Sequence, residues 1–171
     1  MKRSVFYLAT LCTLFACNSN KQADTIPLEA PEELKALRLQ MGHELISLFH
    51  EDSVQWDIVM ALIDSAQSTF WYDPQFYVAE SYVQYMQGNK VESDSLLLHS
   101  RNLYDLRLQQ RQDFDDAVNR AALTAFLYGL KAFHQELDSL ATIDAYKPDS
   151  LILQSLHDAF EDFDPKLSDL F

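Results

Sequence analysis

The stretch DPQFYVAESYVQYMQGN, residues 73–89, contains the signals that decide the fold. An aspartate before a proline is typical of a helix start, because the Asp73 side chain can accept a hydrogen bond from a free N–H group and Pro74 fits the first turn. Gly88 followed by Asn89 is typical of a helix end, because glycine readily adopts the left-handed conformation found there. The apolar side chains that this segment offers to a core include Phe76, Tyr77, Val83 and Met86. One short helix with defined ends is therefore predicted.

Similar signals extend the helical pattern in both directions. Before this segment, apolar residues spaced three and four apart predict helices at about 31–50 and 56–70. After it, the predicted helices are 91–111, 113–128 with Asp113 as N-cap, 132–145, and one that begins at Pro148, with a last short turn opened by Asp164-Pro165. Strand signals are nearly absent, because the chain has no Asn-Gly or Asp-Gly turn and no long apolar and polar alternation. The predicted fold class is all-α, with about seven helices.

The turn signals recur at spacings that are typical of α-solenoids. Gly88 and Gly129 are 41 residues apart, and each lies between two paired helices. Pro74 and Pro148 each open a helix and are 74 residues apart, which is close to two units in the high thirties. These spacings predict helical hairpins of similar length.

The region of about residues 55–150 resembles tetratricopeptide repeats (TPRs), with matches in two segments. The residues that carry the resemblance are Leu62-Ile63-Asp64-Ser65-Ala66, Asp73-Pro74, Tyr85 and Gly88-Asn89 in the first segment, and Phe126-Leu127-Tyr128, Phe133, Leu137, Leu140 and Pro148-Asp149-Ser150 in the second. Two positions depart from the pattern, since Glu136 stands where a small alanine is usual and Lys131 replaces the usual hairpin glycine. The resemblance implies antiparallel helical hairpins stacked as a short TPR-like α-solenoid, in which each hairpin covers its neighbour's apolar face. An irregular helical bundle is the alternative.

The N-terminus resembles the signal of a bacterial lipoprotein. Lys2 and Arg3 precede an apolar stretch, 5–16, that is shorter than the roughly 20 residues of a transmembrane helix but suits a secretory signal. The stretch ends in Leu14-Phe15-Ala16-Cys17, which resembles the lipobox. The resemblance implies a cleaved signal at 1–16, lipidated Cys17 followed by a flexible tether to residue 30, and a helical domain at 31–171. An ordinary cleaved signal with a chance cysteine is the alternative.

This signal also implies a location for the protein. Cys12 would be removed with the signal, and acylation would account for the remaining unpaired Cys17 in an exported chain. Several acyl chains anchor a protein stably. We therefore expect a cell-envelope lipoprotein that is anchored to a membrane facing the periplasm or the cell exterior, and Asn18 after the cysteine implies the outer membrane.

Composition and motifs exclude several function classes. With 13 Lys and Arg against 26 Asp and Glu, the formal net charge of −13 opposes binding to nucleic acid. Three glycines are too few for glycine-rich phosphate loops, and no hydrolase or nucleotide motif is present, so neither an enzyme nor a cofactor is predicted. His157 and Glu161 are one helical turn apart, but two ligands do not make a metal site. The acidic run at 113–116 lacks the spacing of a calcium loop, so no metal is predicted.

Clustered aromatic residues are the feature most suggestive of binding. Phe70, Trp71 and Tyr72 are consecutive, and three residues spread over about 200° on a helix cannot all face one core. The candidate partner-binding or ligand-binding residues are Trp71, Tyr72, Tyr77 and Tyr82. Within a TPR-like hairpin, Tyr82 is predicted to line the concave groove and Tyr85 to lie in the core. The alternative is that all these aromatic residues form repeat core.

Together these features predict a membrane-anchored lipoprotein that acts as a non-enzymatic, TPR-like scaffold for an unknown protein partner. A second hypothesis is a small-molecule-binding lipoprotein with an aromatic pocket between its helical hairpins.

Overall fold

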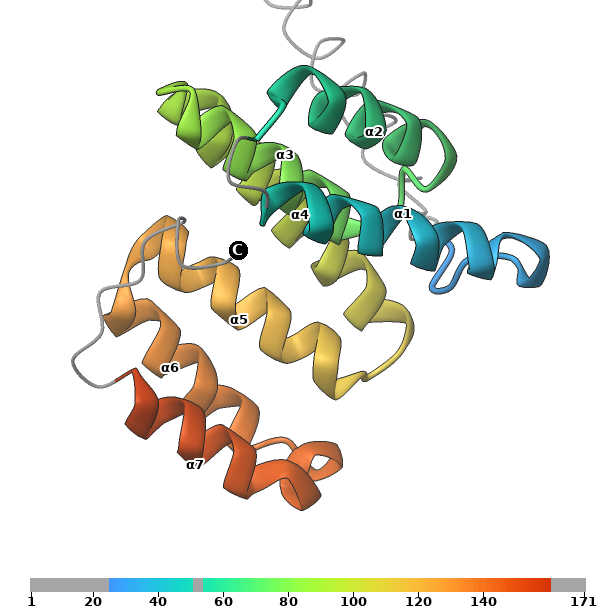
Figure 1. Cartoon of the computed structure of the whole chain (residues 1–171). Helices are drawn as coiled ribbons and strands as arrows, with labels where there is room; N and C mark the ends of the chain where they lie inside the picture. The colour runs from blue at the N-terminus through green and yellow to red at the C-terminus, as the bar shows by residue number, and fades with distance from the viewer. Residues whose placement is uncertain (1–24, 51–53, 161–171) are drawn as a thin grey trace, which may run out of the picture.

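The computed structural model of the chain describes residues 25–50 and 54–160, and this part is helical (Figure 1). Its α-helices are α1 (Lys35–Phe49), α2 (Trp56–Thr69), α3 (Pro74–Met86), α4 (Lys90–Gln110), α5 (Phe114–Tyr128), α6 (Leu130–Ala141) and α7 (Ser150–Ala159). Two 3-10 helices, η1 (Glu32–Leu34) and η2 (Asp144–Asp149), precede α1 and α7. No strand occurs in the described ranges, so the all-α prediction is confirmed. No helix in these ranges is long and apolar enough to cross a membrane.

The predicted helix ends are confirmed where local chemistry fixes them. Asp73 Oδ1 accepts a hydrogen bond from the Gln75 amide at 3.1 Å and caps α3, and Asp113 Oδ1 accepts one from the Asp116 amide at 3.1 Å and caps α5. Gly88 and Gly129 have φ angles of 82° and 84°, a region that L side chains avoid. The short links between α3 and α4 and between α5 and α6 depend on these glycines.

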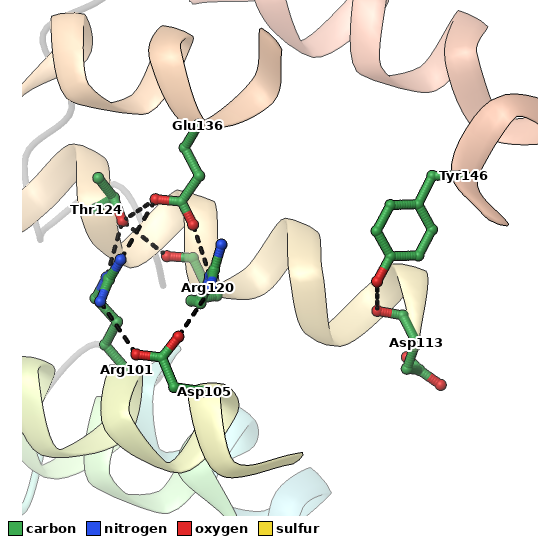
Figure 2. Close-up of polar contacts among 7 residues, drawn as sticks. All are labelled: Arg101, Asp105, Asp113, Arg120, Thr124, Glu136 and Tyr146. Carbon is green, nitrogen blue, oxygen red and sulfur yellow. Dashed lines mark hydrogen bonds and ion pairs between the residues drawn. The ribbon is translucent and has the colours of Figure 1, made fainter. Parts of the chain in front are cut away.

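The C-terminal helices differ from the prediction. Helix α6 ends at Ala141 rather than Ala145, and Pro148 lies inside η2 instead of opening α7. The residue before a proline avoids the α-helical conformation, which favours a helix boundary in this segment. Buried Tyr146 packs its ring against Phe114 at a centroid distance of 5.7 Å, and its hydroxyl donates to the Asp113 carbonyl at 3.4 Å (Figure 2).

The helices pack mainly against their neighbours in chain order, which makes successive helical hairpins. Helix α2 lies at one end of the molecule and α7 at the other (Figure 1). The hairpin of α3 and α4 is closely packed through small buried serines. Ser81 Oγ lies 2.9 Å from Ser93 Oγ, and Ser100 Oγ donates to the Pro74 carbonyl at 2.9 Å. Small hydrogen-bonded side chains let the two helices approach without leaving buried polar groups unsatisfied.

Three apolar clusters form the core. One joins α1, α2 and α3, a second joins α5, α6, η2 and α7, and a third connects α4 to α5 through Leu97, Tyr104 and Leu123. The first cluster also contains Ile26, which is only 6% exposed. Glu29 forms ion pairs with Arg111 at 3.2 Å and Lys35 at 3.7 Å. The prediction of a flexible tether that reaches residue 30 is therefore wrong for residues 26–30, and Cys17 lies outside the described residues.

A charged network joins α4, α5 and α6 at the position where the repeat resemblance expects alanine (Figure 2). Glu136 on α6 accepts a hydrogen bond from Arg120 Nε at 2.7 Å and one from Thr124 Oγ1 at 2.6 Å, both on α5. Arg101 on α4 lies 3.6 Å from the same carboxylate, and Asp105 bridges the two arginines at 3.2 and 2.8 Å. Two arginines and two carboxylates balance in charge, so the network fixes three helices together without an excess charge.

Candidate binding groove

A groove runs across α1, α3, α5 and α7. The first three are the first helices of the hairpins α1–α2, α3–α4 and α5–α6, and α7 follows the last hairpin. The larger part of the groove has a volume of about 900 Å³ and also contacts residues 28–30 and the C-terminal end of α4. We call this part the polar half, because arginine, lysine, aspartate and tyrosine side chains line it. Residues at both ends of the chain of helices, on α1 and on α7, thus line the same surface.

An apolar pocket of about 230 Å³ continues the groove between α1, α3 and α5. Its apolar lining comes from Leu45, Ile46 and Phe49 on α1, Phe76, Val78 and Ala79 on α3, and Ala122 and Leu123 on α5. Arg38, Gln75, Tyr104 and Asn119 line both the polar half and the apolar pocket. A ligand could therefore occupy both parts at once.

Gly42, in the middle of α1, lies on the wall of the apolar pocket. A Cβ atom added there would meet no heavy atom within 4 Å. Glycine inside a helix is less stable than alanine by roughly 0.5–1 kcal/mol, so neither backbone geometry nor close packing explains this glycine. Its effect on the structure is to keep the pocket open beside α1.

Two ion pairs form the floor of the polar half. Arg38 Nε donates to Asp73 Oδ2 at 2.8 Å, and Arg107 Nε donates to Asp116 Oδ2 at 2.9 Å. Both aspartates are mostly buried, and the Asp73 carboxylate is held from two sides because it also caps α3. The floor is therefore rigid and close to neutral in charge.

Two buried tyrosines lie beside these ion pairs. Tyr72 is 6% exposed and lines the polar half, and its hydroxyl has no hydrogen-bond partner among the described residues. Tyr104 is 4% exposed and lines both the polar half and the apolar pocket. Its hydroxyl forms no hydrogen bond with the described residues. Burial, and then the negative charge of Asp73, raises the pKa of both hydroxyls above the ordinary value of 10. Both groups are therefore protonated and able to donate.

The structure separates the four aromatic residues predicted to bind a partner. Tyr72 lines the groove, as described above. Trp71 is 51% exposed and packs edge-on against Tyr72 at 5.8 Å, and Tyr77 donates its hydroxyl to the Trp71 carbonyl at 3.0 Å. Tyr82 is half-buried and packs against Phe49 at 5.1 Å, next to the apolar pocket.

Tyr85 was predicted to lie in the core, and this prediction is wrong. Its side chain is 37% exposed. It belongs to the last turn of α3, and residues 85–92 around the hairpin turn are all exposed. Proximity to the hairpin turn, from which burial was inferred, instead places this tyrosine at the edge of the molecule.

The candidate metal ligands do not form a cluster in the described residues. No group of three or more His, Cys, Asp or Glu side chains there is arranged to hold an ion. His157 stacks against His134 with ring centroids 4.3 Å apart, and Glu161, its predicted neighbour, lies outside the described residues. The stacked rings pair α6 with α7.

Sequence reasoning missed most of the groove floor. Arg38, Tyr104, Arg107 and Asp116 were not singled out as site residues, because they come from three helices far apart in the chain. Gly42 alone carried a local signal, since an isolated glycine inside an apolar helical pattern often has a packing or functional reason.

No protein-family model matches the chain, and no curated protein or solved structure is significantly similar to it.

Proposed function

We propose that this protein is a non-enzymatic scaffold that binds a segment of a partner protein in its groove. The observation that carries the proposal is the continuity of a polar half and an apolar pocket across alternate helices. Such a surface offers hydrogen bonds and a side-chain pocket to an extended segment, as peptide-binding grooves do. Each floor carboxylate is held by an arginine, and that of Asp73 also by the helix cap, which suits positioning better than proton transfer.

The same proposal includes the lipid anchor at Cys17. Because Ile26 is packed in the core, the stretch between Cys17 and Ile26 can place the anchor at most about 30 Å from the core. An anchored groove would therefore face partners close to the membrane surface. Cys17→Ser should release the protein from the membrane fraction after a carbonate wash, whereas Cys12→Ser should leave it anchored. Retention of Cys17→Ser in the membrane would refute the anchor.

Two substitutions at one position test the groove. Leucine and alanine both favour helix over glycine, so Gly42→Leu and Gly42→Ala should both fold. The leucine side chain would extend into the apolar pocket, whereas the alanine methyl would leave most of it open. In cross-linking and affinity capture from solubilised envelopes, partner recovery should fall at least tenfold for Gly42→Leu and remain for Gly42→Ala. Equal recovery would place partner binding elsewhere.

A small organic molecule is the second candidate ligand. The observation that favours it is the aromatic lining of the apolar pocket, to which Phe49, Phe76 and Tyr104 contribute. Native mass spectrometry of the purified full chain would then show a bound compound that is lost in Gly42→Leu, without any captured protein.

A further inference from the structure

Some hydrogen-bond donors of the groove floor have no acceptor among the described residues. Arg107 uses Nε for Asp116, and neither of its Nη groups makes a hydrogen bond within the described residues. The hydroxyl of Tyr72, which lines the same polar half, is buried without a hydrogen-bond partner among those residues, and the hydroxyl of Tyr104 forms no hydrogen bond with them. A buried donor without a partner, such as the Tyr72 hydroxyl, is rare in folded proteins. A ligand that supplies oxygen acceptors would satisfy it and would also accept hydrogen bonds from Tyr104 and Arg107.

The charge of the groove restricts the kind of acceptor. Asp116 already compensates Arg107, and Asp73 compensates Arg38. The wall of the groove adds Asp115 and Asp149, which form no ion pair with the described residues, and the chain as a whole carries a formal charge of −13. An anionic ligand would gain little from the neutral floor and would be repelled by these walls. Neutral oxygen atoms meet the donors without that repulsion.

We propose that Tyr72, Tyr104 and Arg107 bind main-chain carbonyl oxygens of the partner segment, while one of its apolar side chains enters the pocket beside Gly42. This inference rests on the function proposed above and adds the chemistry of the ligand. The partner segment places neutral carbonyl groups against the groove floor and needs no carboxylate to bind. Main-chain carbonyls occur in every peptide, so specificity comes from the apolar side chain and from the acidic wall.

The arrangement predicts opposite effects on stability and binding. Tyr72→Phe and Tyr104→Phe keep the buried ring and remove only an unpartnered hydroxyl, so neither should lower the stability of the protein. Each hydroxyl that donates to a ligand carbonyl should contribute about threefold to tenfold in affinity. Tyr128→Phe is the matched control, because Tyr128 is exposed on α5 and does not line the groove.

The probe is a set of twelve-residue peptides selected from a random display library on the full chain, with counter-selection against Gly42→Leu. Selected peptides are synthesised with amidated C-termini, and their affinities are measured by fluorescence anisotropy for the wild type and the three phenylalanine variants. The double variant Tyr72→Phe/Tyr104→Phe should bind about tenfold or more weakly, and Tyr128→Phe should bind as the wild type does. A thioamide scan, which weakens one carbonyl acceptor at a time, should find positions whose penalty disappears in a phenylalanine variant.

The possible outcomes separate this inference from the proposed function. Groove-dependent peptides whose affinity is unchanged in the double variant would overturn the carbonyl assignment and leave the scaffold proposal standing. Peptides that require a free carboxylate, or whose binding collapses with salt, would show an anion site and overturn the assignment as well. A selection without any peptide sensitive to Gly42→Leu would overturn both. In the last outcome, a synthetic peptide of residues 161–171 displaces the selected peptides, and deletion of these residues from the chain strengthens peptide binding. Both results together would make the chain's own C-terminal segment the occupant and overturn the partner proposal.

Discussion

Glu136 gives the sharpest test of how the hairpins pack, because the repeat resemblance and the structure predict opposite results for Glu136→Ala. In a TPR-like hairpin a small residue at this position lets the two helices approach, so alanine should be harmless or stabilising. In this protein the carboxylate binds Arg120 at 2.7 Å and Thr124 at 2.6 Å and lies 3.6 Å from Arg101 (Figure 2). Removing it would leave two arginines with one fewer partner each.

The size of the loss follows from burial. The Glu136 side chain is 10% exposed, and the two arginine side chains are 22% and 24% exposed. Breaking a fully buried pair costs about 3–5 kcal/mol, whereas hydrogen bonds to charged groups contribute about 1.5–3 kcal/mol. For this partly buried network we expect Glu136→Ala to lower the free energy of unfolding by about 2–3 kcal/mol. Glu136→Gln, which keeps an acceptor for Thr124, should lose less.

Urea unfolding followed by circular dichroism measures both changes in the free energy of unfolding. The slope of this free energy against urea concentration should be the same in the wild type and the variants, which checks that unfolding remains two-state. Asp138→Ala is the control, because Asp138 is exposed on the same helix, and its effect should stay within about 0.5 kcal/mol. Equal or higher stability of Glu136→Ala would refute the stabilising role of the network and favour the repeat-like packing.

Three further predictions concern single side chains. Gly42→Ala should raise the free energy of unfolding by about 0.5–1 kcal/mol, read as a melting temperature a few degrees higher in calorimetry, because its methyl group meets no neighbour. Tyr85→Ala should cost about 1 kcal/mol or less, and Phe70→Ala about 3–5 kcal/mol in urea unfolding, because Phe70 is fully buried whereas Tyr85 is not. The hydrogen bond from Arg111, and then the charge of Lys35, lowers the pKa of Glu29, so this carboxylate supports the fold above its unfolded pKa and its contribution is lost as the pH falls through the lower folded value. Carboxyl NMR titration should show that lowered pKa, and Arg111→Ala should bring it back towards its ordinary value.

Helix ends were predictable because their causes are local. Asp73 and Asp113 cap helices through amides two or three residues away, and Gly88 and Gly129 end or begin helices through their own φ angles. Each of these interactions is complete within a few residues, so the sequence alone contains the whole cause. The segments after Pro31 and around Pro148 departed from the prediction, because in each a 3-10 turn replaced the start of an α-helix.

The groove was only partly predictable because its parts come together through tertiary packing. Arg38, Tyr72 and Arg107 belong to α1, to the link before α3 and to α4, and nothing in their local sequence relates them. The aromatic cluster did point to Tyr72, but the signal was the composition of the segment and could not tell a groove residue from exposed Trp71. Burial of Ile26 was missed for the same reason, since its partners are on helices far along the chain.

Two residues that lower stability, Gly42 and Tyr72, line the groove, and this favours a binding role for it. Most buried polar side chains of the described residues are satisfied, as Ser81 and Ser100 show, and the buried side-chain atoms without partners there are the Tyr72 hydroxyl and His134 Nε2. Phenylalanine in place of Tyr72 and alanine in place of Gly42 would each make a more stable protein by the physical arguments above. Proteins tolerate a loss of stability where their activity needs it. The unpartnered Tyr72 hydroxyl and the open space beside Gly42 lie on the same surface, and ligand binding explains both better than a requirement of the fold does.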